Sequence, residues 1–154
     1  MRIRYIAMTC VLGAALVAGC SDDKKTDTTS GGGVTVPTAT GTQVSLIADD
    51  KSATEQFFTL DPVSVPAGPV TFTFENAGDR QHEMILLKTD TAIDALVITA
   101  DRVSEDDSVG EIPETDAGVT ASQTFDLAAG NYVIVCNIEK HYGQGMRVAF
   151  TVTG

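Results

Sequence analysis

Short runs in which apolar and polar residues alternate constrain the fold of this chain most. In segments 70–75 and 148–152 every second residue is apolar. Alternation with a period of two is typical of strands with one buried face. The same reading predicts seven strands, over 42–48, 56–60, 70–76, 82–88, 119–127, 132–136 and 146–152. Glycine-containing turns and a two-proline link at 66–69 separate several of them, so the sequence predicts an all-β fold, an antiparallel β-sandwich.

One segment, residues 90–117, interrupts this rhythm and is expected to form an excursion between two strands. Ile93, Leu96 and Val97 have helical spacing, which indicates a short helix over 91–102, but the β-branched residues at 97–99 suit a strand equally well. Nine acidic residues and one basic residue, Arg102, lie between 90 and 116. We interpret this charge as a solvated loop in preference to a docking patch for a basic partner.

Residues 1–19 have the pattern of a secretory signal peptide. Arg2 and Arg4 precede an uncharged, largely apolar stretch that is too short to span a membrane. The stretch runs into Val-Ala-Gly-Cys at 17–20, which resembles the bacterial lipobox. The resemblance implies cleavage before Cys20, lipid attachment to Cys20 and anchoring by several acyl chains. We therefore expect an exported lipoprotein on the periplasmic or other extracytoplasmic side of a bacterial membrane.

The region after Cys20 divides into a linker and a domain. Residues 20–41 are rich in Ser, Thr, Gly, Asp and Lys, with almost nothing apolar before Val34, which predicts a flexible linker. Residues 42–154 are then expected to form one domain. Removal of residues 1–19 leaves eight basic residues against twenty-one acidic ones, a formal net charge of about −13. This charge argues against nucleic acid as a partner, and we expect a monomer.

The sulfur and imidazole groups of the chain gather near its C-terminus. Cys136, His141 and Met146 are spaced five residues apart, and His82 is the other histidine of the chain. Once Cys10 is removed and Cys20 is lipidated, Cys136 is a single free thiol in an oxidising compartment, where burial, interchain pairing or a bound ligand would protect it. One thiolate, two imidazoles and a weak thioether are the ligands of a mononuclear blue copper site.

Two stretches resemble the cupredoxin family, of the plastocyanin and azurin type. They are NAGDRQH, which ends at His82, and GNYVIVCNIEKHYGQGM, which ends at Met146. The resemblance implies a Greek-key β-sandwich and one copper ion, Cu(I) or Cu(II), held by His82, Cys136 and His141 with Met146 as axial ligand. It also implies that His141 lies in an apolar surface patch and passes electrons. Familiar members have asparagine, which ties the two ligand loops together, where this chain has Glu83.

Three classes of function are compatible with these residues to different degrees. We favour a membrane-tethered one-electron carrier that exchanges electrons with redox partner proteins. The alternative is a copper-binding module for storage or delivery, which would use the same ligands. An enzyme is not expected, because Cys136 and His141 lack an orienting or oxyanion signature and no further histidines remain for a second copper centre. Zinc fits less well because a thioether is a poor zinc ligand.

Overall fold

A computed structural model describes residues 41–154 of the chain. The predicted signal peptide at 1–19, Cys20 with its predicted lipid and, apart from Gly41, the predicted linker at 20–41 lie outside the described residues. The described part contains strands and no helix, and none of it offers a helical membrane span.

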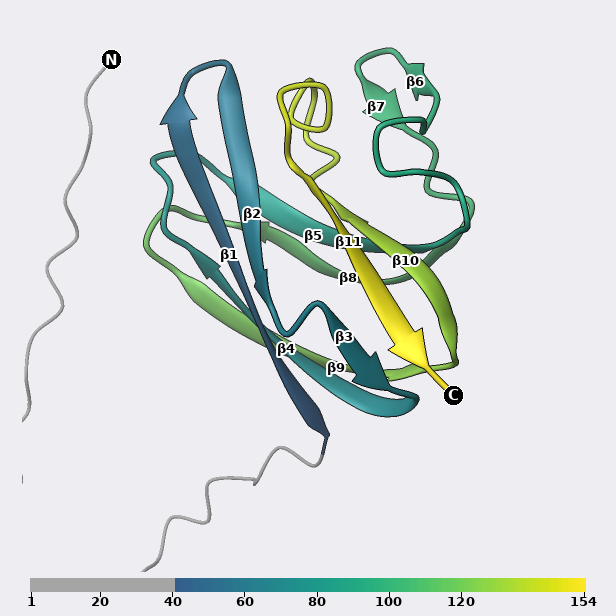
Figure 1. Cartoon of the computed structure of the whole chain (residues 1–154). Coiled ribbons are helices and arrows are strands. Elements are labelled where there is room, and N and C mark those ends of the chain that lie inside the picture. Colours follow the sequence, from purple (N-terminus) through teal and green to yellow (C-terminus); the bar gives the residue numbers. More distant parts are fainter. Residues whose placement is uncertain (1–40) are drawn as a thin grey trace, which may run out of the picture. The chain divides into compact units, whose positions relative to one another are not determined.

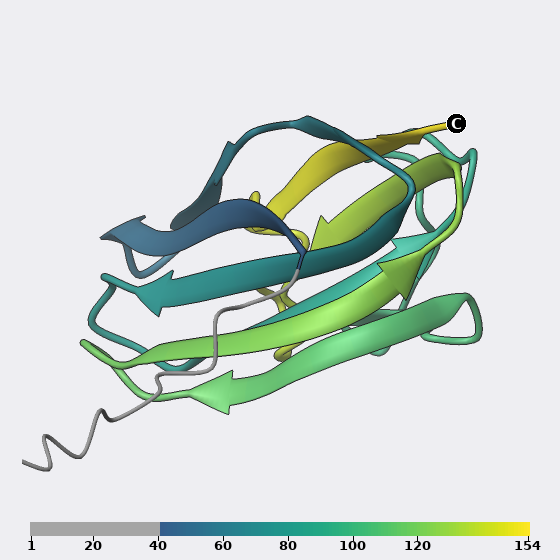
Figure 2. The same cartoon turned by 90° about the horizontal axis from the view of Figure 1, so that it is seen from below.

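Two sheets pack face to face (Figures 1 and 2). The first sheet has the order β2-β1-β4-β9, with β2 at Glu55–Asp61, β1 at Thr42–Ser52, β4 at Gly68–Asn76 and β9 at Thr120–Leu127. The second has the order β3-β11-β10-β5-β8, with β3 at Ser64–Pro66, β11 at Arg147–Thr153, β10 at Gly130–Val135, β5 at His82–Lys88 and β8 at Ser108–Thr115. A small hairpin pairs β6, Ile98–Thr99, with β7, Arg102–Val103.

All seven strands predicted from the alternation are present, which confirms the all-β sandwich. The sheets are mixed and not purely antiparallel, because β1 pairs with β4 and β11 pairs with β3 in parallel. These parallel pairs arise because the chain crosses over between strands that are not consecutive in sequence. The alternation within one strand predicts its buried face but not the direction of its neighbours. The short β3 and the longer β8 were not predicted.

The main core lies between the two sheets and follows the alternation of the strands. Phe72 and Phe74 of β4 are fully buried, and Phe72 packs edge-on against Phe150 of β11 with ring centroids 5.3 Å apart. Burying one side chain of this size stabilises the fold by roughly 1.5–3 kcal/mol. This core joins the two sheets and includes Cys136 and Met146, and His82 is buried as well.

The excursion is not helical, so the helical interpretation of 91–102 is wrong and the strand interpretation is closer. β6 and β7 are joined by Ala100 and Asp101, both with positive φ, the pattern of a two-residue type I′ hairpin. The β-branched residues at 97–99 favour this extended backbone over a helix. We call residues 89–107 the strap; in Figure 1 it lies beside the loop between β10 and β11.

The strap covers the outer face of the second sheet. Ile93, Leu96 and Val103 of the strap pack against outward-facing side chains of β5 and β10, such as Leu87 and Val133, in a second hydrophobic cluster. This contact explains why β10 is buried without alternation from Tyr132 onward. It also holds the strap next to the loop that carries three of the predicted copper ligands.

Candidate metal centre

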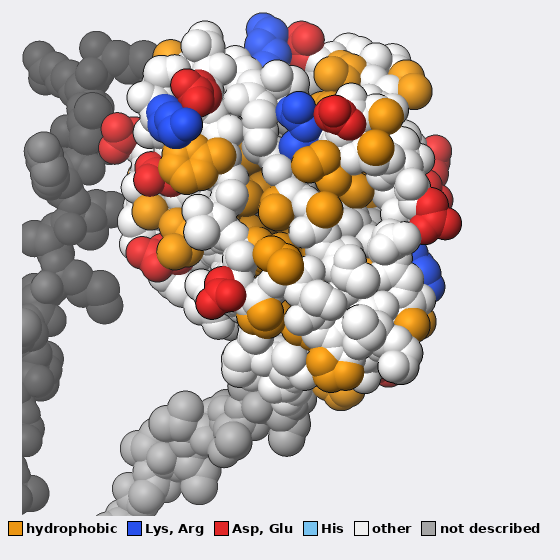
Figure 3. Space-filling view, viewed as in Figure 1, with side chains coloured by type: hydrophobic (Ala, Val, Ile, Leu, Met, Phe, Trp, Pro, Cys, Tyr) orange, Lys and Arg blue, Asp and Glu red, His pale blue; other side chains and the backbone are white. Residues whose placement is uncertain are grey.

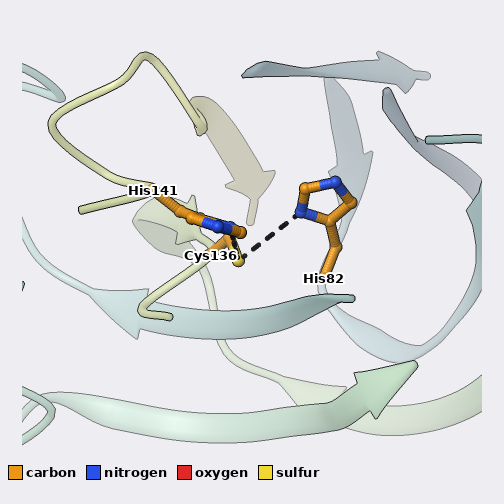
Figure 4. A group of neighbouring side chains, drawn as sticks. All are labelled: His82, Cys136 and His141. Carbon is orange, nitrogen blue, oxygen red and sulfur yellow. Dashed lines mark hydrogen bonds between the residues drawn. The ribbon is translucent and has the colours of Figure 1, made fainter. Parts of the chain in front are cut away.

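Three predicted ligands converge at one end of the sandwich. His82 opens β5, Cys136 follows the last residue of β10, and His141 lies in the loop at 136–146, which we call the ligand loop. The rings of His82 and His141 both face the sulfur of Cys136 (Figure 4). The chain separation of 54 residues between His82 and Cys136 is bridged by the pairing of β5 with β10.

The donor atoms of these residues lie close enough to bind one ion. Cys136 Sγ is 4.0 Å from His82 Nδ1 and 3.3 Å from His141 Nδ1, and the three donor atoms are all within 4.8 Å of one another. Ligands bound to one first-row metal ion at about 2.0–2.3 Å lie roughly 3.5–4 Å apart. Two imidazole nitrogens and one sulfur therefore fit a single copper ion without a large rearrangement.

Met146 lies beside Cys136 and His141 at the end of the ligand loop. Its amide donates to the carbonyl of His141 at 3.0 Å, and its carbonyl accepts from the amide of Cys136 at 3.1 Å. The residue is fully buried, which is compatible with a thioether ligand inside the protein. Its role as axial ligand stays a prediction. Met84 of β5 is also fully buried in the main core.

The ligand loop is held in a compact turn by its own backbone. The amide of His141 donates to Ile138 and that of Gln144 donates to Lys140. Gly145 has a φ of +110°, and a Cβ there would lie 2.9 Å from the carbonyl oxygen of Gln56. Glycine is therefore required where the loop passes against β2.

Burial sets the protonation of the metal-free site. It lowers the pKa of His141 to about 4, with a further contribution from His82, and it lowers the pKa of His82 despite the opposing effect of Asp50. Burial raises the pKa of Cys136 to about 12. At pH 7 both imidazoles are neutral and offer lone pairs, whereas the thiol must lose a proton when a metal binds.

Glu83 ties the two ligand-bearing segments together where familiar cupredoxins use asparagine. Its Oε1 accepts a hydrogen bond from the amide of Asn137 at 2.9 Å, and its own amide lies 3.5 Å from Cys136 Sγ. Burial raises the pKa of Glu83, and the bond from Asn137 opposes the increase. The departure at position 83 therefore keeps the connection between His82 and Cys136 and adds a carboxylate to it.

Asn137 fastens the ligand loop to the strap. Its side-chain oxygen accepts from the amide of Val103 at 2.8 Å, and its side-chain nitrogen donates to the carbonyl of Val103 at 3.0 Å and to Glu105 at 2.6 Å. Arg102 donates to the Asn137 carbonyl at 2.7 Å, and the amide of Lys140 donates to Asp101. The strap is thus a brace for the ligand loop. All nine acidic residues between 90 and 116 are exposed, six of them in the strap and three in or just after β8, as a solvated segment requires.

His141 is 7 % exposed and His82 is fully buried, and neither is visible in Figure 3. Hydrophobic side chains gather in that view where Figure 1 places β6, β7 and the ligand loop. Val97 and Ile98 of the strap are 79 % and 49 % exposed. A hollow of about 250 Å³ lies beside Ile98 and is lined by Ile98, Asp101, Lys140, Gly143 and Gln144.

Sequence reasoning missed the structural roles of two residues that organise the site from other elements. Asn76, at the end of β4, is fully buried and bonds to the carbonyls of Arg80 and Thr115, which shapes the loop before His82. Asp50 of β1 lies 3.2 Å from His82 Nε2. The sequence does contain a pattern that points to Asp50: with Val44, Leu46 and Ala48 it occupies every second position of β1, on the face of the strand that is buried. The strand predicted from the sequence ends at residue 48, two residues before Asp50.

Comparisons with known proteins agree with this geometry. A family model described as Sulfocyanin (SoxE) domain matches residues 58–154, which include the four predicted copper ligands. No curated protein sequence matches the chain.

Solved structures resemble the fold at low sequence identity. Reduced auracyanin from the photosynthetic bacterium Roseiflexus castenholzii is 22% identical, with a TM-score of 0.53 over 74% of this chain and 100% of that one. Rusticyanin from Thiobacillus ferrooxidans is 20% identical, with a TM-score of 0.56 over 73% and 79%. Auracyanin A, a "blue" copper protein from Chloroflexus aurantiacus, is 25% identical, with a TM-score of 0.51 over 72% and 99%.

Proposed function

This chain belongs to the sulfocyanin (SoxE) family, and we infer from that membership and from the donor set at its metal centre that it is a type 1 copper protein that carries single electrons. Copper, when bound, supplies the one-electron couple between Cu(II) and Cu(I). The observation that carries this conclusion is the convergence of two imidazole nitrogens on the buried Cys136 sulfur. His82, Cys136 and His141 would hold the ion, with Met146 in the axial position.

The residues around the site suit electron transfer because they limit movement and exclude water. His82, Cys136 and Met146 have no exposed surface. Glu83 ties the segments of the first and second ligand together, and Asn137 braces the ligand loop against the strap. A site held in this way needs little rearrangement when its charge changes, which lowers the barrier to transfer in both directions. We assign the protein no enzymatic activity.

The test is a redox cycle of the copper-loaded domain at fixed copper content. We expect a strong visible absorption with Cu(II), its loss on reduction and its full return on reoxidation, without release of the metal. Storage or delivery of copper would instead require transfer of the ion to a copper-free acceptor or chelator at physiological concentrations. A colourless Cu(II) form, or loss of copper in each cycle, would contradict the proposed function.

Redox partner proteins are proposed to dock over the ligand loop and the strap. Exposed Ile98, which follows exposed Val97 in the strap, lines the hollow near Lys140 and Gly143, only a few residues from His141. Asp101 lines this hollow and the other acidic residues of the strap are exposed; although most of this charge is solvated, Asp101 favours a partner with a basic group at the rim of its own patch. Electron exchange that slows with rising ionic strength would support this assignment, and exchange independent of salt would oppose it.

A lipid anchor on Cys20 is proposed to hold the domain at an extracytoplasmic membrane surface. The lipobox-like sequence at 17–20 supports it, and a linker of about twenty residues would let the domain reach a donor and an acceptor in turn. In cells that process lipoproteins, Cys20→Ala is expected to move the protein from the membrane fraction to the soluble fraction. The same distribution for wild type and variant would rule out the anchor.

A further inference from the structure

Asp50 is a buried carboxylate next to the metal centre that lies outside the family match at 58–154. It stands near the end of β1 on the inward face of the strand, following Ala48 in phase, and its side chain is 8 % exposed. Gln56, which is 1 % exposed, lies directly opposite it on β2. The carboxylate therefore faces protein. A carboxylate in such a position requires compensation by a donor or a positive charge.

The two oxygens of Asp50 have different neighbours. Oδ2 accepts a hydrogen bond from the amide of Asp79 at 2.8 Å, which fixes the loop between β4 and β5. Oδ1 is 3.2 Å from His82 Nε2, and among the described residues neither of these two atoms has a hydrogen-bond partner with good alignment. Each is thus the nearest available partner of the other. The nitrogen involved is the one that faces away from Cys136, because Nδ1 faces the sulfur.

Gly78 closes this pair off from solvent. A Cβ at position 78 would lie 2.5 Å from Asp50 Oδ2 and 3.1 Å from His82 Nε2. The backbone of the loop therefore presses directly over the carboxylate and the imidazole, and no side chain fits there. An interaction between a carboxylate and an imidazole is stronger in such a confined place than in water.

We propose that Asp50 is a positioning residue for the copper site, which accepts the Nε2–H of His82 and so keeps Nδ1 as the nitrogen that binds the metal. The inference rests on the proposed copper-binding function. A carboxylate that accepts the distal N–H of a metal-bound histidine fixes the tautomer and the ring orientation and makes the ligand more basic. A negative charge so close to the ligand also stabilises Cu(II) more than Cu(I). Asp50 would thereby hold the reduction potential lower than it would be without the charge.

The test compares Asp50→Asn with Asp49→Asn in the copper-loaded protein. Asparagine keeps an oxygen for the amide of Asp79 and the shape of the side chain but removes the charge. We expect Asp50→Asn to shift the ratio of Cu(I) to Cu(II) at a fixed potential at least ten-fold toward Cu(I), a rise of about 59 mV for a one-electron couple. The copper hyperfine splitting of the Cu(II) form should change as well. Asp49→Asn removes the same charge from the neighbouring residue of β1, and we expect a much smaller shift.

A second measurement needs neither copper nor a variant. In metal-free wild type, nitrogen–proton correlation spectra are expected to show His82 as the tautomer protonated at Nε2. This readout separates the two hypotheses, since it applies even if the protein proves not to bind copper as a blue site. The inference is overturned if His82 carries its proton on Nδ1, or if Asp50→Asn changes the potential and spectrum no more than Asp49→Asn. Either result would leave Asp50 as a support for the loop only.

Discussion

Cys136→Ser is expected to abolish the visible absorption of the Cu(II)-loaded protein completely. The colour of a blue copper site arises from charge transfer between a thiolate and Cu(II), and Cys136 is the one cysteine among residues 41–154. A serine hydroxyl is a poor ligand for copper at neutral pH and offers no such transition. Visible absorption and the copper hyperfine splitting, measured at equal copper content, test this expectation.

The matched control is Cys20→Ala in the full chain. It removes a cysteine that lies far from the ligands in sequence, so the absorption of the copper-loaded protein should remain unchanged. Retained colour in Cys136→Ser, or loss of colour in Cys20→Ala, would contradict the assignment of the thiolate. Because Cys136 is fully buried, the circular dichroism of the metal-free variant should be recorded to confirm that it folds.

Asn137→Ala is expected to lower the free energy of unfolding of the metal-free protein by about 2–5 kcal/mol. The substitution removes an acceptor for the amide of Val103 and a donor to its carbonyl, and Val103 is 5 % exposed. A buried backbone group that loses its partner costs about 1–3 kcal/mol, which sets the size of the effect. Urea unfolding measures the change. Hydrogen exchange should also show faster exchange of amides in the strap than in wild type.

Asn131→Ala is the control for this prediction. Asn131 is exposed and its side chain bonds to Asp90 at 2.9 Å, at the other end of the strap. An exposed contact of this kind contributes little, so the change should stay within about 0.5 kcal/mol. If both variants lose the same stability, Asn137 does not fasten the strap in the way the hydrogen bonds indicate.

The strands of the sandwich could be predicted because burial of one face produces an alternating pattern within each short segment of the sequence. The alternation in β4 and β11 is clear enough to place both strands and to identify Phe72 and Phe150 as core residues. The strap could not be predicted in the same way. Its β-branched residues are compatible with either a helix or a strand. Which of the two forms depends on the contact of the strap with the outer face of β5 and β10.

The candidate site likewise has a part that the sequence predicts and a part that depends on contacts between distant residues. Cys136, His141 and Met146 are close in sequence, so their types and spacing, together with the other histidine, His82, indicated a metal site. The hydrogen bond between Glu83 and Asn137 and the contact between Asp50 and His82 join residues 54 and 32 positions apart. Such contacts depend on strand register and loop paths, which no local pattern specifies.

The sequence by itself determined the chemistry of the donors, because the types and spacing of a thiol, an imidazole and a thioether are properties of one short segment. It also determined the strands, since each carries its own alternation. Only the tertiary structure decided how closely the donors approach, what encloses them and which carboxylates flank them. The physical reason is that these features depend on pairings between distant strands, whose register is set by the packing of the whole core.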